Sequence, residues 1–193
     1  MEIRKTETPS RELLLLADEV EASVADYIGR GTCYAACDDG RIVGQYVLIH
    51  TRPFTAEVVN IAVVPDRQRQ GIATALLAHA VDTARRAGFR LLEIGTGNSG
   101  FGQIALYERC GFVRCGIDVD YFRKHSPTPI FENGELVYTL PTLSEISEYA
   151  KREMETFWDE YKRLHSPHRY KVDLSKPLYE LKRGMLEERR SKA

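Results

Sequence analysis

Residues 58–88 constrain the fold more than any other stretch of the chain. They run from an apolar segment through a polar loop with a glycine, Gly71, into a segment with apolar residues at helical spacing. This order predicts a strand that leads through a tight loop into an amphipathic helix. Backbone N–H groups at a helix start favour an anion, and Gly71 has no Cβ to keep a ligand away. Arg67 and Arg69 add positive charge, so the loop is predicted to hold a phosphate; an ordinary strand-to-helix turn is the alternative.

Hydrophobic spacing and turn signals predict the other elements. The expected order is a strand over 1–6, a helix from Thr8-Pro9 to Ile28, strands over 32–37, 41–50 and 55–64, a helix over 71–87 with His79 at its surface, a strand over 90–95, a helix over 103–110 and a strand over 112–119. The long apolar strand 55–64 is placed in the middle of the sheet. Strand 90–95 should run parallel to it, because a helix makes the crossover. The chain is therefore expected to form an α/β fold with a mixed central sheet flanked by helices.

Composition narrows the class of partner. The chain has 193 residues, 27 of them basic and 28 acidic, which gives no electrostatic case for nucleic acid or an anionic membrane. It has no apolar run of the roughly 20 residues that a membrane span needs, and its N-terminus has no signal-peptide core. None of its four cysteines forms a C-x-x-C pair. We expect a cytoplasmic protein with reduced thiols and no metal site.

Two motifs in this order resemble one known family. Residues 68–73 read QRQGIA, on the pattern Q/R-x-x-G-x-G/A, and residues 105–112 read ALYERCGF, on the pattern A-L-Y-E-x-x-G-F. The chain resembles the GNAT superfamily of N-acetyltransferases over about residues 1–134. The resemblance implies the GNAT fold and the transfer of an acetyl group from acetyl-CoA to a primary amine by direct attack, without a cysteine intermediate.

The resemblance also implies where the cofactor binds. The backbone of Ile61, Ala62 and Val63 would bond the pantetheine arm, in a gap where two parallel strands splay apart. The pyrophosphate would meet the N–H groups of the loop and helix start, which belong to Arg69, Gln70, Gly71, Ile72, Ala73 and Thr74. Asn98, after the next strand, is a further candidate for a pantetheine or substrate contact, with a plain turn residue as the alternative.

The motif tyrosine, Tyr107, is the candidate acid that protonates the leaving thiolate. A phenol has a reference pKa of about 10, so it is protonated at pH 7 and can donate. The alternative is a core aromatic residue on a short helix. The acid assignment follows from the position of Tyr107 in the second motif.

Glu57 is the candidate general base. Strand alternation puts it on the same face as Val59, Ile61 and Val63, unless a bulge intervenes. The alternatives are a solvated carboxylate and a water chain with no dedicated base. His50, Glu93 and Asp118 are weaker candidates.

The chain changes character after about residue 135. Residues 142–145 read TLSE, a capping box, and an apolar stripe at helical spacing follows it over 146–164; a second helix is expected over 178–188. The letters over about 135–188 resemble the C-terminal end of nicotinate phosphoribosyltransferases. That end carries no active site, so no functional residue is transferred. We expect a GNAT domain over 1–140 and a helical tail over 141–193 that is not an independent catalytic domain.

The junction creates a structural demand. A GNAT domain has one further strand after the position of Asn133-Gly134, and here residues 135–140 are expected to supply it. Without that strand a sheet edge would stay unpaired. The apolar stripe of the tail must also be covered, by the domain, by a second copy in a homodimer or by another protein.

Three functions remain open from the sequence alone. The leading one is acetyl transfer to a small-molecule or peptide amine. The second is non-catalytic: acyl-CoA binding, or docking of the helical tail on a partner. The third, an accessory role in nicotinate salvage, depends on the tail alone.

Overall fold

The computed structural model describes residues 1–97, 100–118, 121, 131–132, 135–136 and 168–175. Their helices and strands are β1 (Glu2–Thr6), α1 (Arg11–Ala17), α2 (Glu21–Arg30), β2 (Thr32–Asp38), β3 (Arg41–Arg52), β4 (Thr55–Val63), a 3₁₀ helix (Pro65–Arg67), α3 (Ile72–Arg86), β5 (Leu91–Thr96), α4 (Phe101–Arg109), β6 (Val113–Ile117), β7 (Phe131–Glu132), β8 (Glu135–Leu136) and β9 (His168–Asp173). Among these, no helix combines the length and the apolar character that a membrane span requires.

The strands form one large mixed sheet. Its hydrogen-bonded order is β1-β2-β3-β4-β5-β9-β6, and β7 and β8 form a separate two-stranded sheet. β1 to β4 pair antiparallel, whereas β4 and β5 pair parallel. The helix α3 connects β4 to β5, as the crossover rule predicts.

Contacts divide the chain into two compact units. The first comprises Met1–Ile94, Leu106–Val113 and Tyr170–Ala193; the second comprises Gly95–Ala105 and Arg114–Arg169. Within the second unit, Arg169 Nη1 lies 3.7 Å from Asp118 Oδ2, and the Cys115 thiol donates to the Arg169 carbonyl at 3.5 Å. The first unit holds β1 to β4 and α1 to α3.

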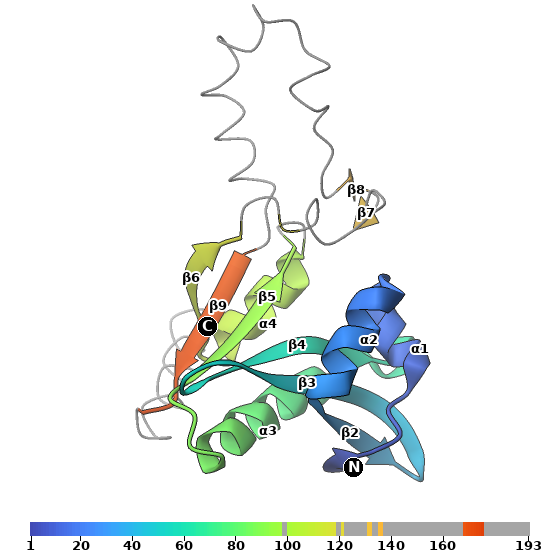
Figure 1. The fold of residues 1–193 in the computed structure, drawn as a ribbon. Coiled ribbons are helices and arrows are strands. Elements are labelled where there is room, and N and C mark those ends of the chain that lie inside the picture. Colours follow the sequence, from blue (N-terminus) through green and yellow to red (C-terminus); the bar gives the residue numbers. More distant parts are fainter. Residues whose placement is uncertain (98–99, 119–120, 122–130, 133–134, 137–167, 176–193) are drawn as a thin grey trace, which may run out of the picture. The chain divides into compact units, whose positions relative to one another are not determined.

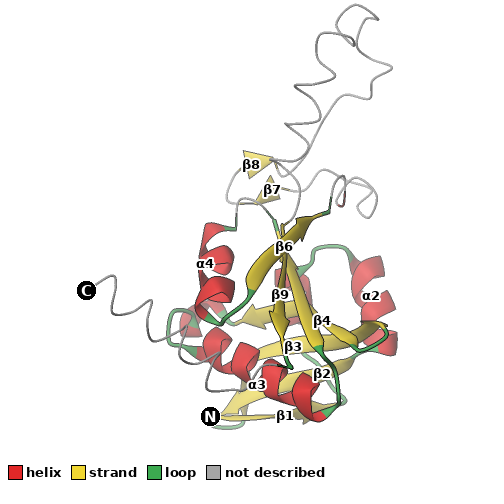
Figure 2. Cartoon of the chain, turned by 90° about the vertical axis from the view of Figure 1, so that its left-hand side faces the viewer, coloured by secondary structure: helices red, strands yellow, loops and turns green. Residues whose placement is uncertain are grey.

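In the first unit, helices cover both faces of the strands (Figure 1, Figure 2). On one face, Leu14 of α1 and Tyr27 of α2 pack with Val47 and Ile49 of β3 in a buried apolar cluster. On the other face, α3 buries one side, made up of Ile72, Leu76, Leu77, Ala80, Val81 and Ala84. Burial of apolar side chains on both faces stabilises these strands as a layer between helices.

Close approach of α3 to the sheet depends on a glycine of β3. A Cβ at Gly44 would lie 3.1 Å from Leu76 Cδ1 and 3.2 Å from Ile72 Cγ2. Further along α3, His79 is half-buried, and its Nδ1 lies 2.8 Å from the Tyr46 hydroxyl. Burial lowers the pKa of His79. The expectation that His79 lies at the surface is therefore wrong.

The expected helix over 9–28 is two helices. Ser10 begins α1, since its hydroxyl accepts from the Leu13 N–H at 3.4 Å. Asp18 ends α1 in an extended conformation, and its carboxylate accepts from the Val20 N–H at 3.0 Å. This local turn competes with the helix, which apolar spacing alone does not reveal.

The strand between β5 and β6 comes from the tail. That place is filled by β9, whereas β8, at the start of the segment expected to fill it, pairs with β7. The expectation that residues 135–140 complete the large sheet is therefore wrong for Glu135–Leu136, and residues 137–140 lie outside the described residues. The tail helices expected over 146–164 and 178–188 lie outside the described residues. The division into 1–140 and 141–193 stays a prediction.

Asn60 joins β4 to the helices on its face. Its side chain is 3% exposed, and its Nδ2 donates to the Leu14 carbonyl at 2.9 Å and to the Tyr27 hydroxyl at 2.8 Å. One buried amide therefore holds α1 and α2 against the same strand. A buried polar group whose partner is removed destabilises the fold by its full desolvation penalty.

We expect Asn60→Ala to lower the free energy of unfolding by about 1–3 kcal/mol, because it leaves the Leu14 carbonyl with one donor fewer in a buried place. Urea unfolding followed by circular dichroism measures this change. Glu12→Ala, at an exposed position of α1, is the control and should stay within about 0.5 kcal/mol. An unchanged urea midpoint for Asn60→Ala would contradict the prediction.

Candidate active site

The loop before α3 has the backbone geometry of an anion site. Gly71 is the N-cap of α3 with φ +84°, and Arg69 has φ +60°. The first N–H groups of a helix have no partner within the helix, and here Gly71 provides no capping side chain. A Cβ at Gly71 would meet no atom within 4 Å, so the backbone at the helix start is open. These features fit a phosphate group at residues 69–74.

Two glutamines hold the loop in this shape. Gln68 Nε2 donates to the Val63 carbonyl at 3.1 Å, and Gln70 Nε2 donates to the Asp66 carbonyl at 3.2 Å. The first bond ties the loop back to the end of β4. The amides of the sequence motif therefore have a structural role here.

The two loop arginines differ in their electrostatic surroundings. Arg67 Nη2 lies 2.5 Å from Asp38 Oδ2, and this ion pair lowers the pKa of the Asp38 carboxyl. Arg69 is exposed and has no ion-pair partner within the part of the chain that the structure describes. The positive charge of Arg67 is thus offset by Asp38, and Arg69 is the loop cation that remains for an anionic ligand.

The pairing between β4 and β5 ends part-way along β4. The parallel register of the two strands runs from Thr55↔Leu91 to Val58↔Ile94, and within the described residues it goes no further. β4 itself continues to Val63, paired on its other side with β3 up to Gly44↔Val63. Beyond Val58, no described strand pairs with β4 on the β5 side, and the Val63 carbonyl there accepts from Gln68 Nε2. An open stretch of strand backbone is the arrangement expected for a pantetheine arm at Ile61, Ala62 and Val63.

A β-bulge lies at the same point of β4. Val47 pairs with Asn60 whereas Leu48 pairs with Val58, so Val59 is an extra residue on β4. On the two sides of the bulge, Glu57 is paired with Ile49 of β3, and Ile61 is paired with Tyr46 of β3.

The bulge puts Glu57 and Ile61 on different faces of the sheet. Ile49 belongs to the cluster under α1 and α2, whereas the Tyr46 hydroxyl contacts His79 of α3, and paired residues share a face. The expectation that Glu57 and Ile61 share a face is therefore wrong, and the bulge is the reason.

Glu57 has another carboxylate beside it. It is paired with Glu93 of β5, so the two side chains lie on one face of neighbouring strands. Glu93 is 4% exposed, and Arg52 Nη2 lies 2.6 Å from its Oε1. The carboxylates of Glu57 and Glu93 and the guanidinium of Arg52 thus lie at this end of the sheet.

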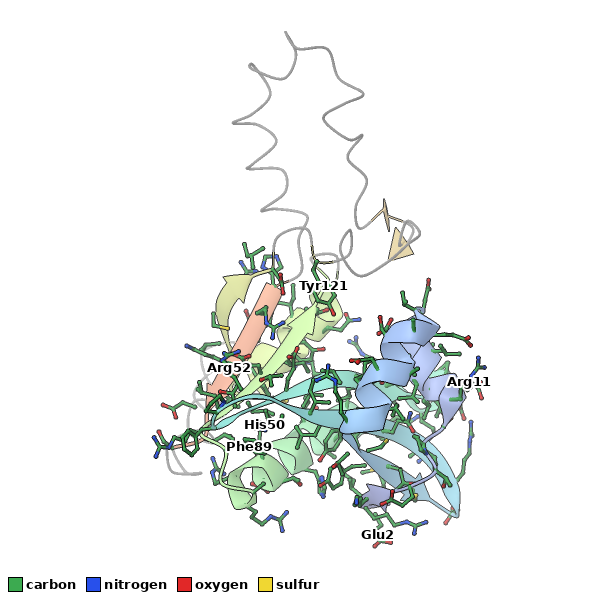
Figure 3. All side chains as sticks on the ribbon, viewed as in Figure 1. Glu2, Arg11, His50, Arg52, Phe89 and Tyr121 are labelled. Atoms are coloured by element: carbon green, nitrogen blue, oxygen red, sulfur yellow. The ribbon has the colours of Figure 1, made fainter. Side chains whose placement is uncertain are left out.

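The other candidate bases lie elsewhere. His50 packs against the ring of Phe89, with 5.4 Å between the ring centroids, and its Nε2 lies 2.8 Å from the Arg52 carbonyl; Figure 3 shows these side chains at the end of β3. Asp118 is ion-paired with Arg169 in the second unit. Glu93 is the candidate that the structure brings next to Glu57.

Tyr107 is buried on α4, with 3% of its surface exposed. Its ring contacts Phe112, with centroids 6.2 Å apart, and Tyr170 of β9, edge-on, with centroids 5.9 Å apart. Tyr170 was not among the sequence candidates. The alternation of buried His168, Tyr170 and Val172 is the signal that could have identified its strand.

Asn98 lies outside the described residues, and its role stays a prediction. Within the described residues, no group of three or more His, Cys, Asp or Glu side chains is placed to hold a metal ion.

Comparison with known proteins decides the family. The model of the Acetyltransferase (GNAT) family matches residues 2–112. The chain belongs to this family. It is 46% identical over 123 residues to the uncharacterized N-acetyltransferase YvbK of Bacillus subtilis, which covers 64% of this chain and 79% of that protein. The GNAT resemblance stated above is thereby confirmed.

Solved structures of GNAT enzymes agree. An IAA acetyltransferase from Bacillus cereus is 39% identical, with a TM-score of 0.71 over 89% of this chain and 97% of the other. A GNAT acetyltransferase from Elizabethkingia anophelis with acetyl-CoA bound is 30% identical, with a TM-score of 0.71 and the same coverage. This GNAT chain is accordingly an acyltransferase with acetyl-CoA as the acetyl donor. The open start of α3 and the unpaired edge of β4 fit that donor.

The tail matches a second family. The model of the nicotinate phosphoribosyltransferase C-terminal domain matches residues 123–182. The chain is 34% identical over 73 residues to nicotinate phosphoribosyltransferase of Bacillus subtilis, of which it covers 15%. The resemblance of the tail is confirmed, and β9 lies within the matched residues.

We expect thiol probes to separate the cysteines by burial. Burial raises the pKa of Cys33 and of Cys110 to about 11, and the thiolate is the reactive form. At pH 8, a maleimide should label exposed Cys115 first and leave Cys33 and Cys110 unlabelled in the folded chain. Mass spectrometry of the peptides over time measures this order, with Cys115→Ser as the control that removes the fast phase. Rapid labelling of Cys110, three residues from Tyr107, would contradict the prediction.

Proposed function

We propose that this chain transfers the acetyl group of acetyl-CoA to a primary amine of a small molecule or peptide by direct attack. The amine nitrogen forms a bond to the acetyl carbon, and the bond from that carbon to sulfur breaks. Glu57 accepts the proton that the amine loses, and Tyr107 gives its hydroxyl proton to the thiolate. No cysteine carries the acetyl group.

The observation that carries this proposal is the joint presence on β4 of a carboxylate and an unpaired edge. Glu57 is the last but one residue of the parallel pairing, which ends at Val58. Ile61, Ala62 and Val63 follow on the open stretch. We assign the pantetheine arm to these three residues and the pyrophosphate to Arg69, Gln70, Gly71, Ile72, Ala73 and Thr74. Asn98 is proposed as a further contact.

The place of Glu57 supports its role as base. Glu57 and Glu93 are cross-strand neighbours, and Glu93 is buried and ion-paired with Arg52. A carboxylate within reach of an attacking amine can accept the proton that the nitrogen loses. We assign this role to Glu57, which lies on β4 just before the stretch assigned to the pantetheine arm.

Burial of Tyr107 supports its role as acid. A phenol held among aromatic rings is shielded from water, and its ring keeps one orientation. Donation to the departing sulfur avoids release of a free thiolate in a poorly solvated place.

The phosphate assignment predicts a specific effect of Gly71→Ala. An alanine at φ +84° strains the backbone at the helix start, and the displaced N–H groups should raise the Kd for acetyl-CoA about tenfold, which corresponds to about one lost hydrogen bond to a charged group. Isothermal titration calorimetry without an acceptor measures the Kd.

Gly88→Ala is the matched control for this experiment. Gly88 also has φ +84° and open space around its Cα, but it lies after the C-terminal end of α3. Both variants should lose similar stability, and only Gly71→Ala should lose affinity. Equal affinity of the two variants would refute the assignment of the pyrophosphate.

The acid assignment predicts that Tyr107→Phe lowers kcat by about 10²–10⁴-fold, because the ring stays and only the proton donor is lost. The Kd for acetyl-CoA should not change. A panel of primary amines, assayed by release of the free CoA thiol, identifies an acceptor and then measures kcat. Tyr34→Phe, at the stacked pair with Tyr46, is the control and should keep full turnover. Undiminished kcat in Tyr107→Phe would rule out Tyr107 as the acid.

A further inference from the structure

The residues at the end of β9 are fixed by buried side chains and by two hydrogen bonds of Leu174. Tyr170, Val172 and Leu174 are 0%, 1% and 4% exposed, so one side of this segment is buried. The Leu174 N–H donates to the Arg90 carbonyl at 2.9 Å, and its own carbonyl accepts from Arg85 Nε at 3.2 Å. The segment is thereby tied to the end of α3 and to the residue before β5.

Tyr170 is held by this segment against the candidate acid. Its ring meets the ring of Tyr107 edge-on, with an interplanar angle of 69° and centroids 5.9 Å apart, which is a preferred aromatic geometry. The ring of Tyr107 also contacts the ring of Phe112, with 6.2 Å between the centroids. Two aromatic rings, one from the motif and one from the tail, therefore enclose the ring of Tyr107.

The hydroxyl of Tyr170 adds nothing to this packing. It is buried and has no hydrogen-bond partner among the described residues, although such a group destabilises the fold. The favourable contact of Tyr170 is that of its ring. Phenylalanine should therefore serve equally well at this position.

We propose that Tyr170 is a positioning residue for Tyr107, so that the segment matched to the nicotinate phosphoribosyltransferase C-terminal domain forms part of the acetyltransferase's catalytic unit. This inference rests on the proposed role of Tyr107 as acid. The ring of Tyr170 fixes the direction of the Tyr107 hydroxyl, and small errors in the position of a catalytic group reduce turnover strongly. The tail thus takes part in the GNAT reaction through a ring contact, without contributing a group that reacts.

Variants of the full chain test the proposal. Tyr170→Leu removes the ring, and we expect kcat to fall about tenfold or more while the KM and Kd for acetyl-CoA stay within twofold. Tyr170→Phe should restore kcat to the level of the parent. Val172→Ala, on the same buried side of β9, is the control for lost packing and should lower stability without changing kcat at a temperature where it is folded.

A second variant separates loss of the ring contact from loss of folding. Tyr170→Met replaces the ring with an unbranched, adaptable side chain that fills irregular space better than leucine, and it should show the same loss of kcat. In the Tyr107→Phe background, Tyr170→Met should cause no further loss, because both changes affect one proton transfer.

The outcomes separate the two proposals. If Tyr107→Phe retains turnover, the proposed acid is wrong. If Tyr107→Phe loses turnover but Tyr170→Leu or Tyr170→Met matches Val172→Ala in kcat, Tyr107 stands and the positioning role of Tyr170 is overturned. Failure of Tyr170→Phe to restore kcat would also overturn it, because the ring contact would then not be the cause.

Discussion

The extra residue at Val59 is the constraint on which the site depends. It breaks the period of two along β4, so that Glu57 lies on the face of α1 and α2 whereas Ile61 lies on the face of α3. At the same place the parallel pairing with β5 ends, and the edge of β4 opens. Asn60, directly after the bulge, fixes both helices of one face through its amide. A single irregularity thus separates the carboxylate from the backbone stretch assigned to the cofactor and gives each its own surroundings.

The sequence predicted the parts of the site that local chemistry determines. Gly71 lies in the left-handed conformation that a loop entering a helix requires, and the apolar spacing of α3 gave its buried side correctly. The bulge could not be predicted, because Val58, Val59 and Asn60 fit a regular strand as well as an irregular one. The pairing of Glu57 with Glu93 and the ion pair of Arg67 with Asp38 join residues far apart in the chain, so only the tertiary structure reveals them.

The tail shows a different limit of sequence interpretation. Helical spacing over 146–164 predicts helices, while residues 168–173 form a short segment in which His168, Tyr170 and Val172 alternate with charged residues. Their buried side became visible only where β9 lies between two strands of the sheet. A resemblance to a family with another activity also directed the interpretation away from the GNAT sheet. The strand that lies between β5 and β6 is determined by the topology of the sheet more than by the local sequence of the tail.

The place of β9 has a consequence for how the protein acquires its structure. β5 is followed by α4, β6 and the segment up to residue 167 before the strand that lies beside it is reached. Contacts between residues so far apart form slowly, because the intervening loop must be closed before they contribute any stability. On the ribosome, the first strands and α3 can assemble early, whereas β5 must wait for its second neighbour. The β5 edge of the sheet therefore stays unpaired from the synthesis of β5 until β9 is made, and an unpaired strand edge is prone to aggregation during that interval.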